Sequence, residues 1–237
     1  MDPKRIQEVA WIGQDYVKGK IRGVILTFHG LGGGLKAGIG TEELEWSRHG
    51  GLVVYPYCGP WSWMNRPARR MVDELVAAIY KKFKLSDRIP LISVGGSMGG
   101  QAALLYTRYA QRPVRACFAN YPVCDLKYHF HERPDLPPTI RQALQWPPEA
   151  ELATLLAEHS PMCQVAAMPD IPYRIVHGDV DKAVSKAHHS DKFVAAMRKR
   201  KLNVKYVEVP GMGHGGPVPL EVFADNITFV TSALTGK

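Results

Sequence analysis

The sequence has few of the features that mark disulfide-rich, zinc-binding or membrane proteins. Its four cysteines form no C-x-x-C pair and match no zinc motif; they are Cys58, Cys117, Cys124 and Cys163. A chain of 237 residues can bury a sizeable core without disulfide bonds, so we expect reduced, mostly buried thiols. No window approaches the roughly 20 apolar residues of a membrane span. No apolar region follows the basic pair near the N-terminus, so we expect no signal peptide and a cytoplasmic location.

The sequence also lacks internal repeats and low-complexity tracts, although it carries a formal net charge of +8. Part of that charge lies at residues 198–201 and 81–84, near the ends of expected helices, where cations suit the helix dipole. No recognition motif or interleaved aromatic pattern accompanies it, so we expect no nucleic-acid partner. Attraction of an anionic substrate stays open.

Short apolar runs alternate with longer amphipathic stretches along the chain. The expected strands are residues 23–28, 52–55, 90–94, 114–119, 173–176 and 204–209, and the expected helices are residues 42–48, 67–83, 101–110, 187–201 and 218–234. Near-continuous apolar runs indicate strands covered on both faces. The alternation predicts one α/β domain over residues 1–237, with a mostly parallel, doubly wound sheet and helices on both faces.

One segment, residues 125–170, interrupts this alternation. It contains seven prolines and no convincing strand, and we expect one or two short helices there, the better one around residues 148–158. A long insertion between two core strands is typical of a lid over a site.

The most informative motif is the segment GGSMGG at residues 95–100, which matches G-x-S-x-G between an expected strand and an expected helix. So tight a turn forces Ser97 into a strained backbone conformation and exposes its hydroxyl. Gly95 and Gly99 are expected because a Cβ at either position would crowd the turn. No G-K-[ST] follows, which excludes a P-loop. Ser97 is therefore the candidate nucleophile.

A second glycine-rich segment, HGLGGG at residues 29–34, follows the first strong strand. Acyl transfer needs backbone N–H groups directed at a developing oxyanion. The amide of Met98, directly after the candidate nucleophile, is one expected donor, and the amide of Leu31 in this loop is the other.

The candidate acid and base follow the last two expected strands. Asp179 and Asp181 lie in HGDVD after residues 173–176, at the edge where sites in such sheets lie. We prefer Asp181, and Asp179 is left to hold the turn by bonding its own backbone. His214, in GMGHGG after the final strand, is the one of nine histidines so placed. It completes the order Ser, Asp, His.

Several aromatic and histidine residues allow more than one interpretation. Trp61 and Trp63, in a loop after residues 52–55, either contact substrate or pack that loop onto the core. Trp146 in the insertion is a weaker candidate. His129 and His131 resemble a metal pair but lack a full ligand pattern, so we expect no metal. The pair at residues 188–189 is expected to be the exposed start of a helix.

Together these motifs resemble the α/β-hydrolase superfamily, and within it the prolyl-oligopeptidase-like group and its small esterase and dienelactone-hydrolase-like relatives. The resemblance covers residue 21 to the C-terminus. It implies that Asp181, the last residue of an H-G-x-x-D run, is the acid and that Leu31 supplies an oxyanion N–H. Dienelactone hydrolases carry cysteine where this chain has Ser97. Prolyl oligopeptidases carry a large propeller domain, and no segment here is long enough for one.

The resemblance therefore implies a serine carboxylesterase that acts on a small-molecule ester through an acyl-enzyme and needs no metal or organic cofactor. Three alternatives stay open: a peptidase, an acyltransferase that uses another alcohol in place of water, and a non-catalytic binding protein on the same fold. The natural ester and the oligomeric state are not determined by the sequence.

Overall fold

The chain folds around a seven-stranded sheet with the order β1-β3-β2-β4-β5-β6-β7. This computed structural model describes residues 1–2, 5–36 and 38–236. All neighbouring strands are parallel except β1, which runs antiparallel to β3. The strands are β1 (Ala10–Ile12), β2 (Gly23–Phe28), β3 (Gly51–Pro56), β4 (Leu91–Gly96), β5 (Val114–Asn120), β6 (Tyr173–Gly178) and β7 (Val204–Val209). All six expected strands are present.

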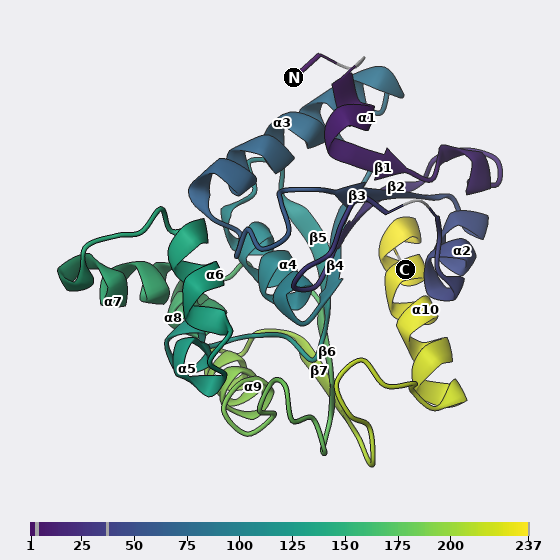
Figure 1. Cartoon of the computed structure of the whole chain (residues 1–237). Coiled ribbons are helices and arrows are strands. Elements are labelled where there is room, and N and C mark those ends of the chain that lie inside the picture. Colours follow the sequence, from purple (N-terminus) through teal and green to yellow (C-terminus); the bar gives the residue numbers. More distant parts are fainter. Residues whose placement is uncertain (3–4, 37, 237) are drawn as a thin grey trace.

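Helices cover both faces of the sheet (Figure 1), as the buried strands β2 and β3 require. One face packs against α1 (Ile6–Val9), α3 (Arg66–Lys82), α4 (Met98–Tyr109) and α9 (Ser190–Lys199). The other packs against α2 (Thr41–Arg48) and α10 (Leu220–Thr235). The remaining short element near the N-terminus is the 3-10 turn η2 (Gln14–Tyr16). The predicted α/β architecture is confirmed.

Local chemistry explains where the main helices begin. Asn65 caps α3 by accepting a hydrogen bond from the Ala68 N–H, and a proline occupies the first turn. Helix α4 begins at Met98, three residues earlier than expected, because the chain turns directly from Ser97 into the helix. In contrast, α9 begins at Ser190 rather than at residue 187.

The sequence patterns did not indicate β1. The strand has only three residues, which is too short to establish a two-residue period. Its pairing with β3 places it at the edge of the sheet, and α1 immediately precedes it.

The insertion at residues 125–170 contains more helix than expected. Its elements are α5 (Leu126–Glu132), α6 (Leu136–Ala143), α7 (Glu149–Glu158), α8 (Pro161–Gln164) and η3 (Val165–Ala167). The expectation of one or two helices is wrong because prolines begin helices here: α6 and α8 carry proline in the first turn, and Pro148 is the N-cap of α7. Helices α5, α6 and α7 share an apolar cluster with Trp63, Met98 and Val184 from outside the insertion.

The four cysteines are free of disulfide bonds; Cys117 and Cys124 are buried, whereas Cys58 is partly exposed and Cys163 is exposed. Within the described residues, no helix is both long and apolar enough to cross a membrane.

Candidate active site

Ser97 lies in a strained turn between β4 and α4. Its backbone has φ 59° and ψ −125°, a left-handed φ that non-glycine residues rarely adopt. A Cβ built on Gly95 would lie 2.2 Å from the Gly99 carbonyl oxygen, and one on Gly99 would lie 2.2 Å from that of Phe28. The expected strain and the expected need for both glycines are confirmed.

His214 connects the hydroxyl of Ser97 to the carboxylate of Asp181. Its Nε2 lies 3.0 Å from Ser97 Oγ, and its Nδ1 lies 2.7 Å from Asp181 Oδ2. The imidazole ring contacts the ring of Tyr121 edge-on, with centroids 4.7 Å apart. The structure therefore brings together three residues from loops that are far apart in the sequence, at the carboxyl edge of the sheet.

Asp181 accepts hydrogen bonds from three donors and lies beside His177. Its side chain is fully buried, and Oδ1 accepts the N–H groups of Ala183 (2.8 Å) and Val184 (3.0 Å). Oδ2 faces His214 and also His177, whose Nε2 is 3.3 Å away. Burial alone would raise the pKa of Asp181, but these imidazole and amide donors hold its pKa well below the usual range. Asp181 is therefore a buried carboxylate rather than a carboxylic acid.

The charge of Asp181 assigns the proton positions in the two imidazoles. Because a carboxylate only accepts, His214 donates its Nδ1–H to Asp181, and its Nε2 accepts the hydroxyl proton of Ser97. His177 carries its proton on Nε2, which points at the Val184 carbonyl (3.1 Å), while its Nδ1 accepts from the hydroxyl of Ser190 (2.7 Å). The arrangement can remove a proton from Ser97 and stabilise the resulting imidazolium.

Asp179 contacts a different loop. Its Oδ1 accepts the Gly211 N–H at 2.6 Å, three residues before His214. Asp179 therefore does not bond its own backbone as suggested. Its side chain instead forms a hydrogen bond between the loops that carry Asp181 and His214.

The two amides expected to bind an oxyanion belong to the residue after Ser97 and to the glycine loop that approaches Ser97. Met98 is the first residue of α4, so its N–H has no acceptor within the helix. The glycine loop approaches closely, because a Cβ on Gly30 would lie 3.9 Å from the Cβ of Ser97. Leu31 follows Gly30 and packs against the apolar cluster of the insertion.

The two tryptophans of the loop after β3 both reach α6. Trp63 is 1% exposed, and its indole N–H donates to Thr139 Oγ1 (3.1 Å). Trp61 is partly exposed and donates to Gln142 Oε1 (3.0 Å). The structure thus gives Trp63 the packing role rather than an open face toward a substrate. Trp146, by contrast, is 62% exposed.

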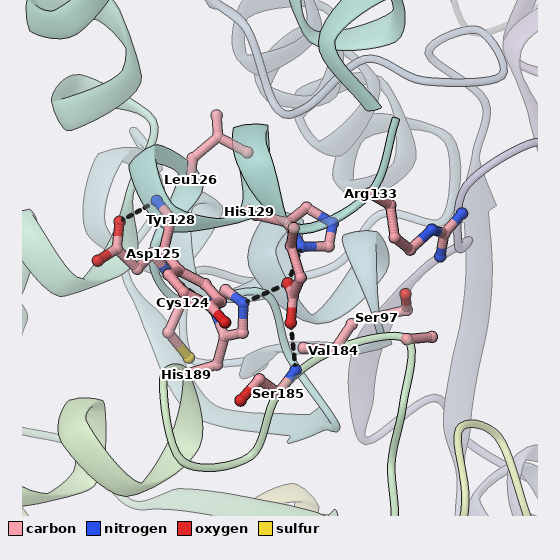
Figure 2. Close-up of polar contacts among 12 residues, drawn as sticks. Ser97, Cys124, Asp125, Leu126, Tyr128, His129, Arg133, Val184, Ser185 and His189 are labelled. Atoms are coloured by element: carbon pink, nitrogen blue, oxygen red, sulfur yellow. Dashed lines mark hydrogen bonds and ion pairs between the residues drawn. The ribbon is translucent and has the colours of Figure 1, made fainter. Parts of the chain in front are cut away.

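The histidines of the insertion and the one before α9 are arranged differently from the sequence expectation. His189 is fully buried, so the expected exposed helix start is wrong at this position. Its ring and that of His129 both contact the carboxylate of Glu132, whereas His131 is exposed. Figure 2 labels both His189 and His129. Sequence spacing could not reveal this cluster because Glu132 and His189 are 57 residues apart. Tyr121, far from His214 in the sequence, was missed for the same reason.

The chain shows likeness to known proteins at two levels. A model of the prolyl oligopeptidase family matches residues 70–235. No curated protein matches the sequence. Among solved structures, a puromycin-hydrolyzing peptidase of Mycobacterium tuberculosis aligns with a TM-score of 0.70 and 18% identity, over 92% of this chain and 35% of that chain.

Two further structures show the range of relatives that share the fold. An acylaminoacyl peptidase of Pyrococcus horikoshii aligns with a TM-score of 0.75 and 13% identity, over 94% of this chain and 38% of that one. A truncated carbohydrate esterase from gut microbiota aligns with a TM-score of 0.72 and 15% identity, over 95% of this chain and 90% of that one. The chain thus spans only 35% and 38% of the two peptidases.

At these identities the structural matches establish the fold, and the family model establishes the family. The sheet order, the turn at Ser97 and the matched region agree on one assignment. The chain belongs to the prolyl oligopeptidase family and has the α/β-hydrolase fold.

Proposed function

We propose that this protein is a serine esterase that hydrolyses carboxylic esters of small molecules with Ser97, His214 and Asp181 as its catalytic triad. The observation that carries the proposal is the continuous hydrogen-bonded path from Ser97 Oγ through both nitrogens of His214 to Asp181, with distances of 3.0 and 2.7 Å. That path allows a hydroxyl to become a nucleophile without a metal or an organic cofactor.

In the acylation step, Ser97 Oγ forms a bond to the ester carbonyl carbon while His214 Nε2 takes the hydroxyl proton. The carbonyl oxygen becomes an oxyanion, for which we propose the amides of Met98 and Leu31 as donors. The amides of Gly32 and Gly33 already donate to Pro60 and Gly30 carbonyls, which supports Leu31 as the donor from that loop. The bond to the alcohol oxygen then breaks, and His214 returns its proton to the departing alcohol.

Deacylation repeats the same steps with water. His214 removes a proton from a water molecule whose oxygen bonds to the acyl carbon. The Ser97–acyl bond then breaks, the proton on His214 returns to Ser97, and the carboxylic acid is released. Asp181, as a buried carboxylate, stabilises the imidazolium formed in both steps.

Two observations bear on the choice between ester and peptide substrates. A carbohydrate esterase shares the fold over 95% of this chain, which supports an ester as the substrate class. The family match keeps a peptidase as the second candidate. Acyl transfer to an alcohol other than water uses the same groups and differs only in the acceptor. We propose Trp61, which is partly exposed beside α6, as a substrate contact.

The test compares hydrolysis of p-nitrophenyl butyrate by the wild-type protein, Ser97→Ala and Ser86→Ala. Ser86 is an exposed serine between α3 and β4 and serves as the matched control. We expect kcat/KM to fall at least about a thousandfold in Ser97→Ala and to stay unchanged in Ser86→Ala. Wild-type activity in Ser97→Ala would exclude the triad.

Two added assays separate the alternatives. Faster cleavage of a p-nitroanilide of an amino acid than of any ester tried would favour the peptidase. A new ester formed when an alcohol is added would favour acyl transfer. If the wild type reacted with none of the substrates and not with a serine-directed fluorophosphonate, a non-catalytic binding protein would be favoured.

A further inference from the structure

A second buried carboxylate, that of Glu132, lies at the end of α5 in the insertion. Its Oε2 is 2.6 Å from His129 Nδ1 and 3.0 Å from His189 Nε2, and its Oε1 accepts the Ser185 N–H at 2.7 Å. In Figure 2, dashed lines join His129, His189 and Ser185 to one unlabelled carboxylate, which these contacts identify as that of Glu132. The Glu132 side chain is only 10% exposed, so the cluster is largely shielded from solvent.

Backbone amides determine which nitrogen of His189 carries the proton. The N–H groups of Cys124 and Asp125 both donate to His189 Nδ1, at 3.0 and 3.1 Å. Nδ1 must therefore present its lone pair, and the single proton of the neutral ring sits on Nε2, where it is donated to Glu132.

This proton assignment decides between a metal site and a hydrogen-bond junction. The ligand atoms of His129, Glu132 and His189 lie within 4.8 Å of one another, close enough to surround a cation. A metal needs the lone pair of His189 Nε2, which is available only if Nδ1 is protonated against two amide donors or the ring becomes an imidazolate. The geometry therefore favours a hydrogen-bond junction.

On one side, the junction reaches the loop that carries Asp181. The amides of Ala183 and Val184 donate to Asp181 Oδ1, and the next amide, that of Ser185, donates to Glu132 Oε1. Three successive N–H groups are thus shared between two carboxylates. The side chain of Val184, between them, is 1% exposed and packs in the apolar cluster of the insertion.

On the other side, the junction reaches the turn that carries Ser97. The Val123 N–H donates to the Ser97 carbonyl (3.3 Å), and the next two amides, those of Cys124 and Asp125, are the donors to His189. A continuous path therefore runs from the backbone of Ser97 through His189 and Glu132 to the loop of Asp181.

We propose that Glu132 is a positioning residue that holds the loop of Asp181 at the correct distance from Ser97, and so keeps the acid aligned with His214. The inference rests on the proposed function, because it assigns Glu132 a role in the same triad. Glu132 forms no hydrogen bond with any member of the proposed triad, all of which lie in the described part of the chain. It acts on the loop of Asp181 through the Ser185 amide and on the turn of Ser97 through His189.

A glutamine at position 132 is a sharp probe of this role. It keeps the size of the side chain but replaces one acceptor oxygen with an NH2 group. His129 can adapt by moving its proton to the other nitrogen, whereas His189 and the Ser185 amide remain donors. One of these two donors must then face the NH2 group, which disrupts the path between Ser97 and the acid loop.

The experiment compares wild type, Glu132→Gln, Glu132→Asp and Asp135→Asn. Asp135, three residues further along, pairs with Arg133 at the surface and is the control for loss of a carboxylate from the same region. The number of reactive sites is first counted by titration with a serine-directed fluorophosphonate. Then kcat and KM for p-nitrophenyl butyrate are measured per reactive site across pH.

We expect Glu132→Gln to lower kcat about 10- to 100-fold per reactive site, with KM changed less than about threefold, because a displaced acid misaligns the base. The acid limb of the kcat/KM profile should move to lower pH, because the His214 imidazolium loses part of its stabilisation. Glu132→Asp keeps the charge but has a shorter reach, so we expect partial recovery. Asp135→Asn should match the wild type.

Each result has a distinct meaning. Wild-type kcat and an unmoved acid limb in Glu132→Gln would overturn the inference, and so would a loss of activity matched entirely by a loss of reactive sites. Should Glu132→Gln fail to fold, Glu132→Asp decides, since wild-type kcat there contradicts the role. If the wild type does not react with the fluorophosphonate, the proposed function fails, which the titration detects before any Glu132 variant is compared.

Discussion

The surroundings of Asp181 and Glu132 use the same local chemistry with different outcomes. Each carboxylate lies within 3.3 Å of nitrogens from two imidazoles and accepts hydrogen bonds from backbone amides of the segment 183–185. The two clusters differ at the second ring nitrogen of the imidazoles His214 and His189. That of His214 faces the hydroxyl of Ser97, whereas that of His189 faces two backbone N–H groups. A hydroxyl can release its proton and a backbone amide cannot, which is why we propose His214, and not His189, as the base that activates a nucleophile.

The comparison is tested most severely by removing the charge of Asp181. We expect Asp181→Asn to lower kcat about 10³- to 10⁴-fold, because an amide cannot stabilise the imidazolium and favours the wrong tautomer of His214. The readout is p-nitrophenyl butyrate hydrolysis. Asp179→Asn is the matched control, since an amide oxygen still accepts the Gly211 N–H. Equal losses in the two variants would contradict the assignment of the acid.

The support around the Glu132 cluster is tested by truncating Trp63, whose ring meets that of His129 edge-on with centroids 5.5 Å apart. Trp63→Ala should lower the free energy of unfolding by about 3–5 kcal/mol, as expected for a fully buried aromatic side chain. The exposed Trp146 provides the control, and Trp146→Ala should change the free energy of unfolding by less than about 0.5 kcal/mol. Urea unfolding gives both values, and similar losses would disprove the difference in burial.

The smallest effect concerns His159, a buried histidine of the insertion outside both clusters. Burial, aided by the nearby Arg69, lowers its pKa from 6.5 to about 4, so it is neutral in the folded protein. The unfolded chain binds a proton below about pH 6.5, and the folded protein does so only near pH 4. Stability therefore falls as pH drops from about 6.5 to about 4.

The measurement is the urea midpoint at pH 7 and at pH 4.5 for the wild type and for His159→Gln. We expect a smaller decrease between the two pH values in the variant, because its side chain does not titrate. An equal decrease in both proteins would assign the acid sensitivity to other groups.

The sequence predicted the sheet, and the site residues at the ends of its strands, well because the patterns that indicate them are local. Residues 95–100 need only a strand, a tight turn and a helix to place Ser97 at the sheet edge. Asp181 and His214 likewise follow strands whose apolar runs are plain, and parallel strands bring their carboxyl ends to one edge.

The insertion was predicted poorly because its structure depends on contacts between distant residues. Prolines that begin helices cannot be told from prolines that break them without knowing where the preceding residues lie. The burial of Trp63 requires α6, which lies more than 70 residues away at the Thr139 hydroxyl. His189 similarly appeared as a polar residue at a helix start because its amide partners, Cys124 and Asp125, come from the beginning of the insertion.

The two edges of the sheet also affect how the protein behaves when concentrated. An unpaired strand edge can pair with another chain and start aggregation. At one edge, β1 offers only three residues for such pairing. At the other, β7 carries exposed Lys205 and Glu208, which form ion pairs with Asp225 and Lys186. A short strand and a charged strand are both poor templates for strand addition, so the sheet ends protect the molecule against association through its backbone.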